Sequence, residues 1–460
     1  MKKSLIYLSI LSASISLASC QGKSQDKIYG EEKELVTSIH PMTGLSGDVT
    51  YKYRYSDDYF LSSSLKMDKN LALLSFISTM SAKDIETASN FATLNGFTMD
   101  ASSLGEGDTI GYYLSHRDTD EYTIINYQLK GYFYGNEQML ENFMIGASGF
   151  HHNFDYVKEI VYSRLITYIK EMSFTKPLKI WINGYSRSGA IANLLVKKIN
   201  DLIDDKILPY KKSDVFVYNF EIPKNKPLEE RNDVKNCFNF INDEDLITHV
   251  PPSQYGFDLY GKTMDIYQEN ALDDISSFFP SLRKIVFTER IYTKDSTGSY
   301  MVKEGGLTKM SEYFDYVCSQ LLKVNTEGGY DLATREHYHN YLEIHLYDLY
   351  DFFTSLNAKQ LQNLSNISSS KLLEIFERVK DDKEKFYNYI KEFFNDAGIT
   401  IYDDPFKDII ADLQGLLAFF GKSKFTMFNI AATFISNVNY VCYNHCPEYN
   451  YWLLKKALNI

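Results

Sequence analysis

Ser186 is the residue in this sequence best placed to act as a nucleophile. The apolar run Leu178-Lys-Ile-Trp-Ile182 leads to Gly184, and an amphipathic segment starts directly after the serine and continues to Ile199. A strand, a tight turn and a helix in succession hold a serine hydroxyl clear of a sheet. They also point the next backbone N–H, that of Arg187, at a developing oxyanion. The pattern therefore predicts a nucleophile elbow.

One position departs from the usual elbow pattern. Gly184 and Gly189 lack the side-chain bulk that would obstruct close packing of strand on helix, but Ser188 stands where G-x-S-x-G has a glycine. A short match of this kind also fits an ordinary Gly-Ser turn, so further residues must support the assignment.

A carboxylate for a serine nucleophile is expected just after the strand-like run Cys237-Phe-Asn-Phe-Ile241. A base must take the serine proton and an acid must orient that base, and in α/β-hydrolases the acid precedes the histidine along the chain. Asp245 stands just past the strand, where this acid should be, and Asp243 and Glu244 are alternatives. A solvated acidic loop is the simpler interpretation of all three.

Strands that alternate with helices should position these residues. Strand patterns cover 109–114, 122–129, 178–182, 215–220 and 237–241, and helical patterns cover 57–97, 153–171 and 187–199. This alternation indicates an α/β fold with an α/β-hydrolase-type wound, mainly parallel sheet, in which ligands bind beyond the carboxyl ends of the strands. Ser186 would lie at that edge, within a core domain spanning 34–264.

A large helical insertion is predicted over 265–437, before a final core segment at 438–460. Helical patterns rich in Phe and Tyr occupy 310–323, 337–356, 370–396 and 404–420. The insertion could be a subdomain packed on the sheet, but we favour a cap over the site because it falls between two candidate catalytic elements. Its aromatic residues would then wall an apolar cleft over Ser186. The aromatic residues expected there are Phe278, Phe279, Tyr313, Phe352, Phe353, Phe419 and Phe420.

The N-terminus has the features of an export signal. Two lysines precede an apolar run from Leu5 to Leu17, which continues as Leu17-Ala-Ser-Cys20. This ending resembles the lipobox of bacterial lipoproteins, which implies a signal peptide at 1–19, lipidation of Cys20 and a polar tether at 20–33. Several acyl chains would anchor the protein stably, since each buried CH₂ contributes about 0.8 kcal/mol. We therefore expect an exported, membrane-anchored lipoprotein at the cell surface or the periplasmic face; an ordinary signal peptide with a chance cysteine is the alternative.

Composition narrows the classes of partner. A formal net charge of −12 argues against nucleic acid as a partner and against purely electrostatic binding to anionic lipid. Beyond Cys20 only Cys237, Cys318, Cys442 and Cys446 remain, too few and too scattered for a disulfide framework. The last two lie four apart and could bind a metal or oxidise together, although buried thiols are the simpler expectation.

Several short motifs, in order along the chain, resemble the class 3 (fungal-type) lipase family, and in particular its bacterial members with a Gly-Tyr-Ser-Arg elbow. The elbow is similar to that family's Gly-His-Ser-Leu-Gly-Gly-Ala, and Tyr218-Asn-Phe-Glu-Ile-Pro223 is similar to its Tyr-Thr-Phe-Gly-x-Pro strand. The loop from Glu244 to Pro252 is similar to Asn-Asp-Ile-Val-Pro-x-Leu-Pro-Pro, and Asn444-His-Cys-Pro-Glu-Tyr449 to a terminal His-x-x-Glu-Tyr segment. The resemblance covers roughly 57–260 and 440–453.

The resemblance implies a lipase-like carboxylic ester hydrolase that works through an acyl-enzyme, without cofactor or metal, on an acyl ester substrate expected to be a lipid. It implies Ser186 as nucleophile, Asp245 as acid and His445 as base. The backbone N–H groups of Arg187 and Tyr132 would bind the oxyanion.

Three departures from the family pattern support a second hypothesis. Lys130 replaces arginine and Tyr132 replaces threonine beside the expected oxyanion site, and Ser188 replaces glycine in the elbow. A catalytically inactive hydrolase fold that serves as a surface binding lipoprotein is therefore the alternative function.

Other histidines compete with His445. His339 is the alternative base and lies in the cluster Glu336-His337-Tyr-His339, to which His345 is close. A shared metal ion is not expected there, because residues i and i+2 on a helix point to different faces. His249 is expected to be a loop residue, and structural roles are expected for the pair His151-His152.

Overall fold

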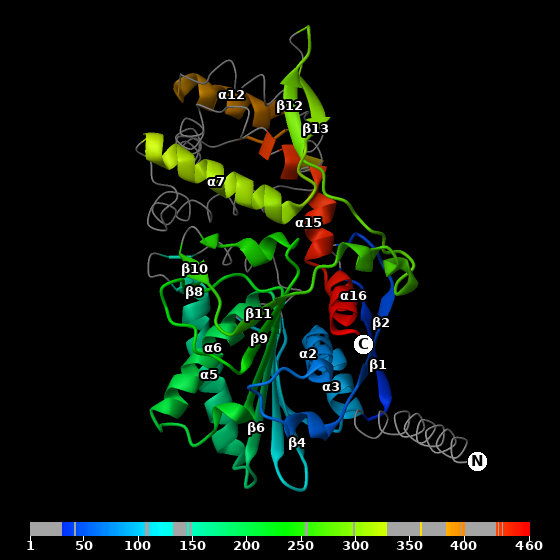
Figure 1. Cartoon of the computed structure of the whole chain (residues 1–460), viewed down its shortest axis with the longest axis vertical. Coiled ribbons are helices and arrows are strands. Elements are labelled where there is room, and N and C mark those ends of the chain that lie inside the picture. The colour runs from blue at the N-terminus through cyan, green and yellow to red at the C-terminus, as the bar shows by residue number, and fades with distance from the viewer. Residues whose placement is uncertain are drawn as a thin grey trace, which may run out of the picture.

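A seven-stranded sheet forms the centre of the molecule (Figure 1). The computed structural model describes residues 30–40, 43–105, 110–131, 145–146, 150–253, 256–297, 300–328, 359–360, 383–396, 398–400, 429–430, 432–434 and 436–460. The strand order is β11-β9-β7-β6-β5-β4-β3, parallel from β11 to β5 and antiparallel at β4 and β3. The strands are β3 (Thr98–Ser103), β4 (Tyr112–Asp118), β5 (Thr123–Leu129), β6 (Leu178–Tyr185), β7 (Val215–Phe220), β9 (Cys237–Ile241) and β11 (Lys262–Asp265). The prediction of an α/β fold with a mainly parallel sheet is confirmed.

Alternating residues of the central strands feed two separate hydrophobic cores. In β7, Val215 and Val217 enter one core, whereas Phe216, Tyr218 and Phe220 enter the other. Successive side chains of a strand point to opposite faces, so β7, in which every side chain is buried, is covered on both faces. The sheet is therefore the middle layer of three.

Helices cover both faces of this sheet (Figure 1). On one face pack α5 (His152–Met172) and α6 (Arg187–Asp204), which supply the aliphatic core. On the other face pack α2 (Lys69–Ser81), α3 (Ile85–Leu94) and α16 (Pro447–Leu458), which form an aromatic-rich core with the sheet. A hairpin of β1 (Glu32–Ser38) and β2 (Asp48–Arg54) packs outside α2. The last helix of the chain thus returns to the sheet near the first.

The N-terminal half differs from the prediction in three places. The helical pattern over 57–97 is two helices, because Asp68 caps the first by accepting from Asn70 and Leu71, and Asp84 caps the second by accepting from Thr87. Strand β3, which follows them, was not predicted. Strand β1 starts at Glu32, inside the range predicted as a tether, because its partner β2 supplies its hydrogen bonds.

The predicted insertion is neither wholly helical nor wholly separate from the core. Its first part contains η6 (Glu269–Leu272) and η7 (Ile275–Ser277), whose apolar side chains join the aromatic-rich core. A hairpin of β12 (Arg290–Lys294) and β13 (Tyr300–Glu304) follows, then α7 (Met310–Gly328) and α12 (Lys383–Asp396); α15 (Val438–Asn444) opens the segment after the insertion. The hairpin was not predicted, and residues directly after 265 pack against the core.

The rest of the insertion's described elements lie beyond the carboxyl ends of the strands (Figure 1). Helix α7 contacts the short helix η4 (Leu246–His249), which follows β9. Helices predicted at 337–356 and 404–420, and the first part (370–382) of the one predicted at 370–396, lie outside the described residues, as do the signal peptide and Cys20. Within the described chain no helix is both long enough and apolar enough to cross a membrane.

Candidate functional site

The chain forms a strained turn at Ser186. β6 ends at Tyr185, α6 begins at Arg187, and the serine between them has φ 54° and ψ −130°. A Cβ atom on Gly184 would lie 2.4 Å from the backbone nitrogen of Gly189, so only glycine lets the strand end and the helix start approach this closely. The local geometry is the predicted elbow, with the serine hydroxyl at the carboxyl edge of the sheet.

Three predicted residues, far apart in the sequence, meet at this edge. His445 Nε2 lies 2.9 Å from Ser186 Oγ, and His445 Nδ1 lies 2.5 Å from Asp245 Oδ2. Asp245 is completely buried and Ser186 is 7% exposed. A neutral imidazole in this position donates from Nδ1 to the carboxylate and accepts the serine proton at Nε2.

The neighbouring acidic residues have other partners. The Asp243 side chain is half exposed, and His249 Nε2 donates to its backbone oxygen at 2.7 Å. Glu244 is buried and accepts hydrogen bonds from the insertion, through Met310 N at 2.6 Å and Ser311 Oγ at 2.8 Å. Neither carboxylate faces His445, so the structure brings only Asp245 of the three to the histidine.

A buried polar network fixes the position of His445. Tyr185 Oη donates to the His445 backbone oxygen at 2.9 Å and accepts from Asn450 Nδ2 at 2.9 Å. Asn242, on the same turn as Asp245, donates to the backbone oxygen and to the side-chain oxygen of Asn444. The residue before the nucleophile and the turn that carries the acid thus both hold the histidine segment. Burial raises the pKa of the Tyr185 phenol, so Tyr185 stays neutral.

Ser188 fits the elbow without disturbing it. Its Oγ accepts from Tyr185 N at 3.1 Å and lies within donating distance of the Leu129 and Tyr185 backbone oxygens, at 3.2 and 3.0 Å. The side chain therefore ties the elbow to the end of β5. A Cβ on Gly131 would lie 1.8 Å from the Tyr185 oxygen, so a glycine is required where β5 passes the elbow.

Lys130 points away from the elbow, and Nζ donates to the Leu104 oxygen at 3.0 Å, beyond β3. Its charge also acts on Asp84, at the start of α3. The backbone N–H of Arg187 starts α6, next to Ser186. Tyr132, the other residue expected to bind the oxyanion, lies outside the described residues.

The remaining candidates that the structure describes have surroundings of their own. The ring of His151 stacks on Phe154, at 3.7 Å between ring centroids, and His339 lies outside the described residues. Cys442 and Cys446 are free thiols, and burial raises the pKa of both. In the described part of the chain, no group of three or more His, Cys, Asp and Glu side chains could hold a metal ion.

Three ionisable groups at the site had not been singled out from the sequence. Glu221, directly after β7, is completely buried, and burial together with the nearby Asp245 raises its pKa well above the ordinary value. Burial raises the pKa of Glu448 to about 7 and lowers that of His40 to about 4, with a smaller contribution from His445 to the latter. The sequence signals for Glu221 were an acid directly after a largely apolar strand and its place at the glycine of the Tyr-Thr-Phe-Gly-x-Pro pattern.

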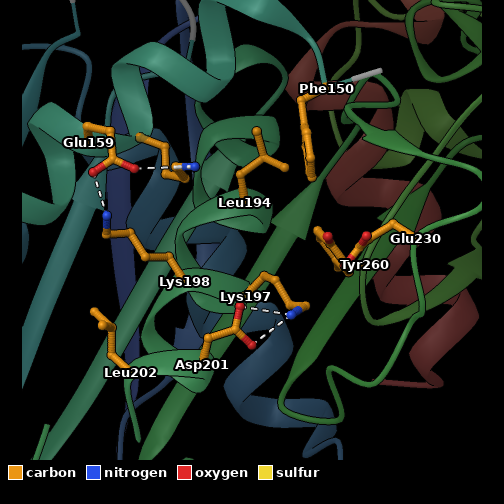
Figure 2. A pocket seen from close by; sticks show the side chains of 10 residues that line it. Phe150, Glu159, Leu194, Lys197, Lys198, Asp201, Leu202, Glu230 and Tyr260 are labelled. Atoms are coloured by element: carbon orange, nitrogen blue, oxygen red, sulfur yellow. Dashed lines mark hydrogen bonds and ion pairs between the residues drawn. The ribbon is translucent and has the colours of Figure 1, made fainter. Parts of the chain in front are cut away.

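A pocket of about 260 Å³ lies elsewhere, on the outer face of α5 and α6 (Figure 2). Its lysines are already paired with its acids: Lys198 with Glu159, and Lys197 with Asp201. Neither Ser186, Asp245 nor His445 lines it. The lining residues are Phe150, Lys158, Glu159, Leu194, Lys197, Lys198, Asp201, Leu202, Glu230 and Tyr260.

The chain has fungal triacylglycerol lipases among its structural neighbours. The triacylglyceride lipase of Rhizomucor miehei is 16% identical, with 44% of this chain and 80% of that chain covered and a TM-score of 0.33. Lipase II of Rhizopus niveus is 15% identical, with 46% of this chain and 80% of that chain covered and a TM-score of 0.33. A lipase of Yarrowia lipolytica is 12% identical, with 43% of this chain and 78% of that chain covered and a TM-score of 0.30. No family model matches the chain, and no curated protein matches it in sequence.

Proposed function

We propose that this protein is a lipase-like carboxylic ester hydrolase. The observation that carries the proposal is the alignment of Ser186, His445 and Asp245, with hydrogen-bonding distances of 2.9 and 2.5 Å between consecutive partners. Three side chains from distant parts of the sequence, aligned on a strained elbow, have the geometry that activates a serine for acyl transfer.

In the proposed mechanism, Ser186 Oγ attacks the acyl carbonyl while His445 Nε2 takes its proton. Asp245 holds the imidazole in the tautomer with hydrogen on Nδ1 and stabilises the imidazolium that forms. The Arg187 N–H, at the positive end of the α6 dipole, is aimed at the developing oxyanion, and Tyr132 is proposed as the second donor. His445 then protonates the leaving alcohol, and water hydrolyses the acyl-enzyme by the same route.

Two of the three departures that favoured an inactive binding protein, Ser188 and Lys130, have structural roles compatible with catalysis, and the third, Tyr132, lies outside the described residues. Ser188 braces the elbow, and Lys130 reaches towards β3 instead of towards the nucleophile. We therefore rank hydrolysis above simple binding, and keep the inactive fold as the outcome that the experiment can reveal.

Replacement of the nucleophile tests the proposal. Ser186→Ala should lower kcat for p-nitrophenyl esters by about 10⁴-fold or more and abolish labelling by a fluorophosphonate, with an unchanged thermal melt. A wild-type protein that neither hydrolyses esters nor reacts with the probe would be the inactive fold, and a fully active variant would exclude Ser186.

The substrate and the anchor belong to the same proposal. We propose a lipid acyl ester as substrate and an exported protein held on the membrane by acyl chains on Cys20. Metabolic labelling with a palmitate analogue should mark the wild type and not Cys20→Ala. The preference for acyl-chain length should be measured as kcat/KM on esters of different length, with a chain that lacks the anchor.

A further inference from the structure

Three adjacent strands deliver three polar side chains to the same edge of the sheet. β6, β7 and β9 are neighbours and parallel, and Ser186, Glu221 and Asp245 lie beyond their respective carboxyl ends. The register continues past the strands, because Ser186 N donates to the Phe220 oxygen at 2.8 Å and Glu221 N donates to the Phe240 oxygen at 3.0 Å. Glu221 thus lies between the nucleophile strand and the acid strand.

The backbone at Glu221 is in an unfavourable conformation for a glutamate. Its φ is 51°, in the left-handed region that glycine occupies without strain. The residue is also completely buried, and a buried carboxyl is costly unless it has partners. The left-handed backbone conformation and the buried carboxyl both cost free energy, so Glu221 needs a contact that compensates for them.

That contact is the triad acid. The Glu221 carboxyl hydrogen-bonds the side chain of Asp245, and both Glu221 oxygens accept from Asn242 N, at 3.2 and 2.9 Å. The other ionisable groups that act on Glu221 are Asp265, beyond the end of β11, and Tyr185, at the end of β6. These described groups are all acids, so none of them compensates a charge on Glu221.

Two carboxylates in contact, both out of water, cannot both be ionised, and one proton must lie between them. The negative charge belongs on Asp245, because Asp245 accepts hydrogen bonds from more donors than Glu221 does. Its Oδ1 accepts from Ile247 N at 3.0 Å and its Oδ2 accepts from His445 Nδ1, whereas among the described residues Glu221 accepts only from Asn242 N. The proton therefore resides on Glu221, whose hydroxyl donates to Asp245.

We propose that Glu221 is a positioning residue, a neutral carboxylic acid that donates to Asp245 and holds the triad acid as a single, oriented negative charge facing His445. The role rests on the proposed function of the triad. With this third donor, the Asp245 carboxylate is held by Ile247, His445 and Glu221, from three different segments of the chain.

Glu221→Gln and Glu221→Ala test the role, because glutamine keeps a donor and alanine does not. We expect Glu221→Gln to keep kcat within about threefold of the wild type, and Glu221→Ala to lower kcat about 10- to 100-fold with KM changed less than about twofold. The acid limb of the kcat/KM profile should stay within about half a pH unit in Glu221→Gln, since one neutral group replaces another. If Glu221 were ionised, removal of its charge would move that limb by about one unit or more, and the proposal would be wrong.

Infrared spectroscopy tests the proton without any activity. At pH 7 the wild type minus Glu221→Gln difference should contain the C=O stretch of one protonated carboxyl, and a spectrum without it would overturn the proposal. Glu159→Gln is the control, because it removes an exposed, ion-paired carboxylate on α5. The wild type minus Glu159→Gln difference should contain no band of a protonated carboxyl. If Glu221→Ala does not fold, Glu221→Gln still tests the proposal, through the acid limb of its kcat/KM profile and through the infrared band. A wild type without esterase activity but with the band would refute the proposed function and leave the shared proton intact.

Discussion

Glu244→Ala should detach the insertion from the loop that carries the triad acid. Glu244 is 1% exposed, and its carboxylate accepts three hydrogen bonds: Met310 N at 2.6 Å, Ser311 Oγ at 2.8 Å and Tyr440 Oη at 2.8 Å. Two of these donors start α7, where the helix dipole also favours a negative charge. The third lies on α15, which leads to His445. One side chain therefore joins Asp245's loop to α7 of the insertion and to α15, which directly follows the insertion.

The magnitude follows from these three contacts. A hydrogen bond to a charged group contributes about 1.5–3 kcal/mol, which gives an upper limit of roughly 4.5–9 kcal/mol for three. Water that enters the vacated space restores part of this, so we expect a loss of about 3–5 kcal/mol in the free energy of unfolding. Tyr440→Phe removes one donor and should cost about 1.5–3 kcal/mol.

Urea unfolding followed by circular dichroism measures the loss, and limited proteolysis locates it. Fragments of Glu244→Ala should begin with cuts around α7, and kcat/KM should fall because α15 no longer holds His445 firmly. Asp243→Ala is the matched control: it removes the adjacent, half-exposed carboxylate and should cost under about 0.5 kcal/mol. If the two alanine variants differ by less than about 1 kcal/mol, the three contacts do not stabilise the insertion as argued.

Further outcomes test the elbow, the histidine and a buried acid. Ser188→Ala should lower the free energy of unfolding by about 1–2 kcal/mol in chemical denaturation and change kcat less than about fivefold, because Ser188 braces the elbow and does not contact His445. Tyr185→Phe should lower kcat about tenfold in a p-nitrophenyl ester assay, because the His445 backbone oxygen loses its donor. The Glu448 pKa is raised from 4.5 to about 7, so its stabilising contribution is complete below pH 4.5 and is lost as pH rises through about 7. Between pH 4.5 and the pH range above 7 the free energy of unfolding should therefore fall by about 3 kcal/mol in the wild type. In Glu448→Gln this fall should be absent, which gives a flatter plot of unfolding free energy against pH.

The sequence by itself determined what depends on neighbours along the chain. The elbow could be predicted because strand, glycine turn and helix are consecutive, and the wound sheet because apolar strand patterns alternate with helical ones. The caps at Asp68 and Asp84, which divide the helical pattern over 57–97, also act over three residues. The apolar spacing continues across both caps, so the pattern alone predicts one helix where the structure has two.

Only the tertiary structure decided among residues of the same type. Asp243, Glu244 and Asp245 are consecutive acids, and nothing local says that one faces a histidine 200 positions further on, one joins the insertion and one stays at the surface. The role of Glu221 depends on the order of strands in the sheet, which puts β7 between β6 and β9. Contacts of this kind are set by how the elements pack, and a side chain's environment, with its pKa, exists only after that packing has formed.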